Sequence, residues 1–169
     1  MIDKNGLLDI LHKIDLELKN KITIVAVGGT AMTLLGLKKI TKDIDFNIPS
    51  DNDYNEFERV INEIGFNIKI DYYRKNTIFS ETLPMDYLKI AIKYKYNFDK
   101  IELYILNPID IVCSKIARLS DRDIEDIKQC IKHYNIRKSQ IKERAMQYEH
   151  AGSDEVFNQN LEYVLETLF

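Results

Sequence analysis

The chain has 169 residues, of which 45% are hydrophobic and 30% charged, and its formal net charge is −3 at pH 7. A chain of this length can bury about two-thirds of its unfolded surface, so one globular domain over residues 1–169 is expected. The mild negative charge gives no support for extensive nucleic-acid binding, and no apolar run approaches the ~20 residues that cross a bilayer. We therefore expect a cytoplasmic protein with no membrane partner.

The first elements predict a packing helix and then a buried strand. Leucines and isoleucines recur at helical spacing over residues 6–19, with Asp3 or Asn5 available as a cap. A β-branched run at 22–27 predicts a strand, and it stops at the sequence Gly28-Gly29-Thr30. Glycine has no Cβ, so its backbone can approach a phosphate closely. Residues 31–37 are expected to form a short buried helix.

Two carboxylates follow in a second short strand, expected at 43–48. Asp43 and Asp45 are two positions apart, so in an extended strand both leave from the same face. Crowded carboxylates repel each other unless a cation lies between them. Mg²⁺ (or Mn²⁺) prefers carboxylate and phosphate oxygens, and it would satisfy this pair. Taken alone, the glycine pair has the alternative of a tight turn, and the Asp pair that of facing solvent. The two pairs together, at this spacing, favour the metal site.

The middle of the chain predicts the rest of a small mixed sheet. Ser50 or Asp51 would cap a helix that ends at Gly65, and alternating apolar residues predict strands at 67–72 and 101–106. Three lysines precede the acidic pair and would meet phosphates or RNA, or lie in a solvated loop; Lys42 is the closest of them to Asp43.

A second informative segment begins at Asn107-Pro108, which would open a helix with proline in its first turn. Ser120 or Asp121 would cap the next helix, whose first-turn acids complement the helix dipole. The remaining chain is expected to be helical. Residues 135–148 carry the basic side chains of a solvated face, namely Arg137, Lys138, Lys142 and Arg144. The apolar stripe of the last helix would pack on its own domain or form a homodimer contact.

The glycine pair and the Asp pair together resemble the signature of the nucleotidyltransferase superfamily, which has the DNA polymerase β-like fold. The form GGTA followed by TKDIDF looks most like the small AbiEii/MenT-like proteins of bacteria and archaea. The segment LNPIDIVCSKIARLSDRDIEDI is similar to a second motif of those proteins. The resemblance implies an α/β (α+β) nucleotidyltransferase fold, with a small mixed sheet flanked by helices over about 20–106 and a helical C-terminal portion over about 108–169.

The resemblance also implies roles for individual residues. The catalytic group would be Asp43, Asp45 and Lys115. The nucleotide-binding residues would be Gly28, Gly29, Thr30, Lys42, Lys115, Arg122, Asp123 and Asp126. The metal ligands would be Asp43, Asp45 and a third carboxylate from a later strand. Residues 77–79 have no acid at the corresponding place, so Asp71 is the first candidate and Glu102 the alternative.

The function that the resemblance implies is metal-dependent transfer of a nucleoside monophosphate from an NTP to a hydroxyl group. The acceptor would be RNA (tRNA) or a protein, in a setting related to toxin-antitoxin pairs. The alternative is a catalytically degenerate module of the same fold that binds nucleotide or another protein. A P-loop or a phosphatase is only weakly supported, because no Gly-Lys-Ser/Thr follows the glycines.

Overall fold

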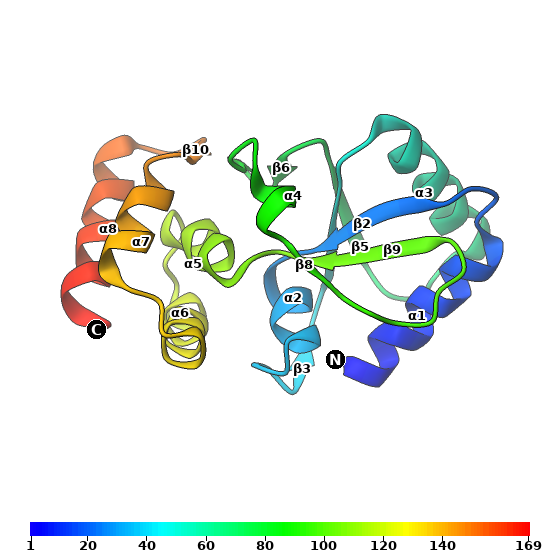
Figure 1. The fold of residues 1–169 in the computed structure, drawn as a ribbon, viewed down its shortest axis with the longest axis horizontal. Coiled ribbons are helices and arrows are strands. Elements are labelled where there is room, and N and C mark those ends of the chain that lie inside the picture. Colours follow the sequence, from blue (N-terminus) through cyan, green and yellow to red (C-terminus); the bar gives the residue numbers. More distant parts are fainter.

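A five-stranded mixed sheet forms the centre of the fold in the computed structural model, which describes residues 1–169 (Figure 1). Its strand order is β5-β4-β2-β9-β8, where β2 pairs with β9 and β4 with β5 in parallel, and the other two pairings are antiparallel. The strands are β2 (Ile22–Ala26), β4 (Ile44–Ile48), β5 (Ile70–Arg74), β8 (Ile92–Lys93) and β9 (Ile101–Ile105). The predicted α/β fold with a small mixed sheet is confirmed.

The helices fall into two groups along the molecule (Figure 1). The first group accompanies the sheet: α1 (Lys4–Glu17), α2 (Gly28–Leu34), α3 (Asp51–Ile64) and the short α4 (Tyr87–Ile90). The second group gathers beside one end of the sheet: α5 (Pro108–Ile116), α6 (Asp121–Tyr134), α7 (Lys138–Ala145) and α8 (Asp154–Thr167). None of these helices combines the length and the apolar composition required to cross a bilayer.

Two small sheets lie outside the central sheet. Strand β1 (Ile2–Asp3) pairs with β3 (Ile40–Thr41). The other small sheet has the order β10-β7-β6, where β6 (Thr77–Ile78) and β7 (Glu81–Thr82) form a hairpin and β10 (Glu149–His150) comes from between α7 and α8. The C-terminal helices are therefore joined by backbone hydrogen bonds to a hairpin that follows β5.

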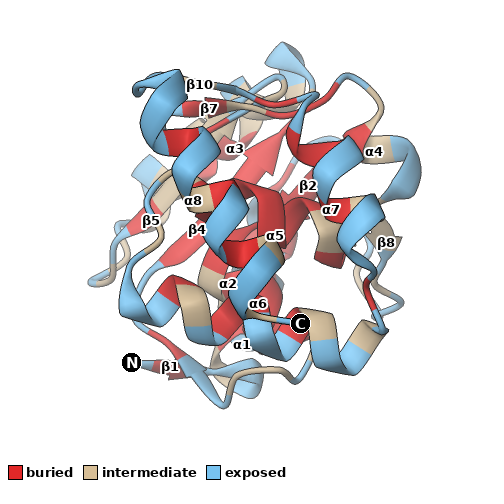
Figure 2. Cartoon of the chain, turned by 90° about the vertical axis from the view of Figure 1, so that its left-hand side faces the viewer, coloured by how far each residue is buried: buried red, intermediate tan, exposed pale blue.

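A single cluster of 40 buried hydrophobic residues runs from the sheet into the C-terminal helices. Figure 2 shows the buried residues lying between the central sheet and the helices that cover it. Cys113 and Cys130 belong to this cluster as free thiols. The apolar side chains of α8, Phe157, Leu161 and Val164, are also in it, and α8 packs on α5 and α7 of its own chain. These three side chains are thus covered by their own chain, whereas Val156 on the same helix is 50% exposed.

Most helix ends lie where their capping residues predict them. The side chain of Asp3 caps α1, Ser50 caps α3, Asn107 caps α5 and Ser120 forms a capping box on α6. Gly65 ends α3 in the left-handed conformation. These features depend on residues within one turn of each other, so local sequence suffices to find them.

Three of the elements whose boundaries differ from the sequence prediction lie at the cleft or lead into it. The strand predicted at 67–72 is β5 at Ile70–Arg74, because only from residue 70 does the chain lie in register with β4. The buried helix predicted at 31–37 begins at Gly28 and ends at Leu34, so the glycine pair forms its first turn. Strand β4 begins at Ile44, which leaves Asp43 immediately before it.

The prediction of a solvated basic face over residues 135–148 was wrong for Arg144. Its guanidinium makes two hydrogen bonds to the fully buried Asp110, at 2.6 and 2.9 Å, and a third at 2.7 Å to Asp86. The hydroxyl of Tyr148 donates to the same Asp110 carboxylate at 2.9 Å. Because a buried carboxylate is costly unless it is paired, Asp110 determines that Arg144 turns inward.

Candidate functional site

A cleft of about 1330 Å³ lies where the sheet, the β6–β7 hairpin and helices α5 and α6 meet. Only 6 of its 28 lining residues are hydrophobic, so it suits a polar ligand. Its volume exceeds the ~300–1,000 Å³ of common small-molecule pockets, which leaves room for a nucleotide and part of a second substrate. The predicted site residues that line it are Gly28, Gly29, Lys42, Asp43, Asp45, Asp71, Lys115, Arg122, Asp123 and Asp126.

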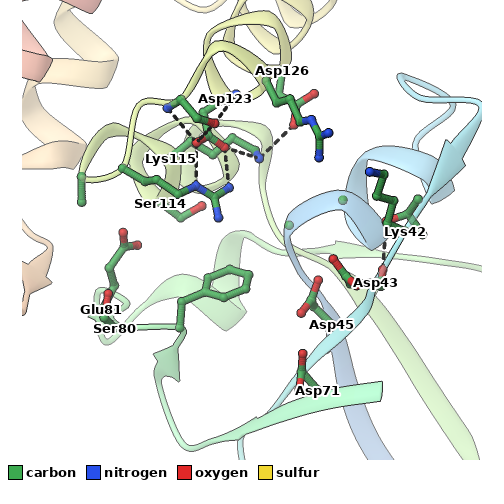
Figure 3. A pocket seen from close by; sticks show the side chains of 18 of the residues that line it. Lys42, Asp43, Asp45, Asp71, Ser80, Glu81, Ser114, Lys115, Asp123 and Asp126 are labelled. Atoms are coloured by element: carbon green, nitrogen blue, oxygen red, sulfur yellow. Dashed lines mark hydrogen bonds and ion pairs between the residues drawn. The ribbon is translucent and has the colours of Figure 1, made fainter. Parts of the chain in front are cut away.

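One wall of the cleft is acidic. Asp45 of β4 and Asp71 of β5 are register partners on parallel strands, and Asp43 precedes β4 (Figure 3). The pKa of Asp45 is raised to about 6, first by burial and then by the charges of Asp71 and Asp43. Its carboxylate has no hydrogen-bond or ion-pair partner in the structure, although the residue is only 7% exposed. This wall therefore carries negative charge that a cation would relieve.

The third carboxylate is already engaged by a lysine. Asp71 lies 2.8 Å from the Nζ of Lys69, and no group of three His, Cys, Asp or Glu side chains is arranged as a set of metal ligands. Lys69 is 73% exposed at its side chain, so this ion pair is a weak surface contact. A divalent cation fits the charge of the acidic wall, with Asp43 and Asp45 open and Asp71 free to exchange Lys69 for it.

The alternative third carboxylate, Glu102, lies outside the cleft. It is opposite Thr23 on β2, near the start of that strand, whereas Asp45 lies beside the end at which β2 leads into Gly28. Glu102 is exposed and faces a separate shallow surface depression. Because β2 runs antiparallel to β4, an acid early in β9 is at the wrong end of the sheet. The structure brings Asp71, and not Glu102, to the Asp pair.

The glycine pair lies tightly packed at the floor of the cleft. Gly28 has φ +54°, and a Cβ there would lie 3.2 Å from the ring of Phe79. A Cβ on Gly29 would lie 2.6 Å from the hydroxyl of Thr41, which itself donates to the carbonyl of Asp43. Any side chain at Gly29 would displace the loop that leads into the acidic wall.

Thr30 has a structural role in place of the phosphate contact predicted for it. Its side chain is completely buried and does not line the cleft. The hydroxyl accepts a hydrogen bond from the amide of Asp45 at 2.9 Å and donates to the carbonyl of Asp43 at 3.3 Å. Thr30 therefore fixes the first turn of α2 against the acidic strand.

The opposite wall carries a cationic cluster made by α5 and α6. Lys115 is buried, and its Nζ lies 2.9 Å from Asp126 and 3.2 Å from Asp123. Arg118 binds Asp123 at 2.6 Å, and Lys38 binds Asp126 at 2.7 Å. Three cations thus share two carboxylates, which leaves this cluster with an excess of positive charge.

The two aspartates of this cluster are held inside the protein. Burial raises the pKa of Asp123, but hydrogen bonds from Arg118 and Ser120 outweigh burial and hold that pKa well below its ordinary value. Asp123 is 0% and Asp126 2% exposed. Both residues line the cleft and position Lys115 and its neighbours, and their contact with nucleotide stays a prediction. Lys42 and Arg122 line the cleft without any ion pair, so their charges remain available.

Several cleft residues escaped the sequence prediction. Arg118 lies one helical turn after Lys115, and that i, i+3 spacing was a signal for it. The others depend on long-range contacts for which the sequence carries no local signal. They are Tyr73, Phe79, Ser80, Glu81, Ser114 and His150.

The mixed sheet, the glycine pair in the first turn of α2 and the carboxylates on β4 and β5 define a protein of the nucleotidyltransferase class. Over residues 5–164 the chain matches the profile of the family "nucleotidyltransferase of unknown function" (DUF6036), and it belongs to that family. The superfamily resemblance is thereby confirmed, whereas the match does not extend to the AbiEii/MenT-like subgroup. No curated protein and no solved structure matches the chain.

Proposed function

We propose that the protein transfers a nucleoside monophosphate from an NTP to a hydroxyl group of an RNA, such as tRNA, or of a protein. The hydroxyl group would give its proton to a carboxylate beside the acceptor, and its oxygen would bond to the α-phosphorus. The bond from that phosphorus to the bridging oxygen would break, and pyrophosphate would leave. The observation that carries this proposal is the register pairing of Asp45 with Asp71 beside Asp43, across a cleft from a cationic wall.

Each wall has its own part in this reaction. Asp43, Asp45 and Asp71 would hold Mg²⁺ or Mn²⁺, which when bound supplies Lewis-acid stabilisation to the phosphoryl oxygens. Lys115 would stabilise charge that develops on the leaving pyrophosphate. Because Asp123 and Asp126 hold its ammonium group in place, this stabilisation requires little rearrangement. Lys42 and Arg122 would bind the phosphates directly.

The proposal also includes the class of acceptor and the biological setting. The size of the cleft supports a second substrate beside the nucleotide. The resemblance of the two motifs to AbiEii/MenT-like proteins supports modification of RNA or protein in a toxin-antitoxin pair. That resemblance alone carries this part of the proposal.

A second candidate function is nucleotide binding without transfer. The observation that favours it is the engagement of Asp71 by Lys69, which leaves only Asp43 and Asp45 open to a metal. A protein of this kind would bind Mg-NTP and release no pyrophosphate. Interaction with a partner protein would then be its purpose.

Calorimetric titration with Mg-ATP, Mg-CTP, Mg-GTP and Mg-UTP tests the site. We expect binding by the wild type that requires magnesium and is lost in the double variant Asp43→Asn/Asp45→Asn. Glu102→Gln is the matched control, because it removes a strand carboxylate outside the cleft and should bind as the wild type does. Equal binding by the double variant would refute the metal site. Pyrophosphate release with candidate acceptors then separates transfer from binding alone.

A further inference from the structure

Two buried charged side chains have no hydrogen-bond or ion-pair partner in the structure. One is Asp45, which belongs to the acidic wall, and the other is Glu81 on β7. The remaining buried charged residues are paired, for example Asp110 with Arg144 and Lys115 with Asp126. Glu81 is only 7% exposed and lines the cleft, and its Oε2 is completely buried. Since buried carboxyl groups normally have partners, Glu81 marks a second candidate binding position in the cleft.

The side chain opposite Glu81, His150, has one partnered and one unpartnered ring nitrogen, since its Nε2 lies 3.5 Å from the carboxylate of Asp154. Glu81 and His150 are register partners on the antiparallel strands β7 and β10, so they lie on the same face of the small sheet. The Nδ1 of His150 is buried without a partner, while its ring stacks on Phe157 at 4.3 Å. The only two completely buried side-chain polar atoms without partners are thus on facing residues. This concentration indicates a polar subsite.

The turn beside Glu81 carries an exposed aromatic ring in an unfavourable backbone conformation. Phe79 and Ser80 form the two-residue turn between Ile78 and Glu81, and Phe79 has φ +50°. Glycine is the usual residue at such a position, because a bulky side chain is strained there. The Phe79 ring is nevertheless 45% exposed and lines the cleft, in contact with Tyr73 at 5.3 Å between centroids. Strained residues of this kind cluster at ligand sites.

We propose that the β6–β7 hairpin is the nucleobase subsite of the cleft, where a base stacks on Phe79 and its polar edge hydrogen-bonds to Glu81, with His150 beside it. This inference rests on the proposed function and adds to it the part of the NTP that the hairpin recognises. Aromatic rings stack on every base, whereas carboxyl groups distinguish bases by their N–H groups.

The position of the hairpin suits a base better than a phosphate. Glu81 lies apart from Asp43, Asp45 and Asp71, and therefore away from the acidic wall where the reacting phosphate would bind (Figure 3). Phosphates have their own partners in the cations of the opposite wall. Burial raises the pKa of Glu81 to about 8, with Arg118 lowering it and Asp123 raising it. At neutral pH the carboxyl group is therefore largely protonated, and it offers one donor and one acceptor to a base edge.

Calorimetry with the four Mg-NTPs and with Mg-tripolyphosphate separates the base from the phosphates. The variants are Phe79→Gly, which suits the φ of the turn, and Glu81→Gln, which keeps the shape of the side chain. Phe79→Tyr retains a stacking ring and should restore binding. Tyr96→Ala and Glu102→Gln are matched controls, because both residues are exposed and lie outside the cleft.

We expect Phe79→Gly to weaken the binding of all four NTPs by about tenfold or more, since stacking contributes roughly 1–3 kcal/mol per base. The binding of tripolyphosphate should stay unchanged. Glu81→Gln should change the order of preference among the NTPs. Unchanged NTP binding in both variants, or an equal loss of tripolyphosphate binding, would overturn the proposed base subsite and leave the proposed function standing. A wild type that binds neither NTP nor tripolyphosphate would overturn the proposed function and this inference with it.

Discussion

Asp45 and Asp71 face each other in register on the parallel strands β4 and β5, so two carboxylates share one face of the sheet at the edge of the cleft. Their proximity, together with burial, raises the pKa of Asp45 from 3.8 to about 6. The folded protein therefore holds a proton that the unfolded chain releases more easily. The stability that this proton provides is complete below about pH 4 and is lost as the pH rises through 6.

Replacing Asp45 should therefore stabilise the metal-free protein while removing its function. We expect Asp45→Asn to raise the free energy of unfolding by about 2 kcal/mol at pH 7.5, because the carboxamide carries no charge to bury. The gain should vanish near pH 4. Urea unfolding at the two pH values measures it, and a variant less stable than the wild type at pH 7.5 would contradict the electrostatic account.

Lys69 competes with a divalent cation for Asp71. We expect Lys69→Met to tighten Mg²⁺ binding by up to about fivefold, because an exposed ion pair contributes up to ~1 kcal/mol. Mg²⁺ titration followed by thermal unfolding measures this change. Lys75→Met is the matched control, since Lys75 is similarly exposed and its nearest carboxylate, Asp51, lies outside the cleft. Equal effects of both substitutions would show that only general charge is involved.

Glu81 gives a second pH dependence of stability. Burial raises its folded pKa from 4.5 to about 8, so its favourable contribution is complete below about pH 4.5 and is lost as the pH rises through 8. The charged groups facing it are Arg118, Asp123 and Lys115. Glu81→Gln should thus unfold at a higher temperature than the wild type at pH 9, with little difference at pH 4.5. Parallel melting temperatures across this range would refute the raised pKa.

The Arg144–Asp110 pair should be the most sensitive polar contact in the C-terminal helices. Arg144→Leu leaves the fully buried Asp110 with only Tyr148 as a side-chain partner, and we expect a loss of about 3–5 kcal/mol in the free energy of unfolding. Arg144→Lys should lose stability too, because lysine cannot make the two parallel hydrogen bonds of the guanidinium. Chemical denaturation measures both. The double variant Arg144→Leu/Asp110→Leu should recover part of the loss.

Gly29 tests the link between the glycine pair and the acidic wall. An alanine Cβ would lie 2.6 Å from the hydroxyl of Thr41, which holds the carbonyl of Asp43. We expect Gly29→Ala to cost about 1–3 kcal/mol of stability and to weaken Mg²⁺ binding, since Asp43 must move with Thr41. Gly152→Ala is the control, because nothing lies within 4 Å of the added Cβ. Thermal unfolding with and without Mg²⁺ compares the two.

The acidic wall and the helix caps were predictable because they depend on neighbouring residues. Asp43 and Asp45 share a face through the alternation of a strand, and Ser120 caps α6 from within its own first turn. Asp71 was the preferred third carboxylate because its strand directly follows the Asp pair, and the register of β5 with β4 brings it there. Sequence periodicity does not give that register.

The rest of the site depends on partners that are far apart in the chain. Arg144 is buried because Asp110, 34 positions earlier, is itself fully buried and needs a charged partner. Glu81 meets His150 only because β10 returns from the C-terminal helices to pair with β7. The polarity pattern of a helix or strand predicts which of its faces is polar. It does not predict which residues pack against that face.

The hydrogen bonds of Thr30 affect how far the length of the segment between the glycine pair and the Asp pair can vary. Its hydroxyl holds Asp43 and Asp45 directly, although Asp43 is thirteen positions away. The distance between the glycine pair and the carboxylates is thus set through space, and the number of residues between them is incidental. Insertions at the turn around Gly36, where nothing packs within 4 Å of a Cβ, would loop out and leave both halves of the motif in place. Searches for distant relatives should therefore allow a variable spacer and require the threonine.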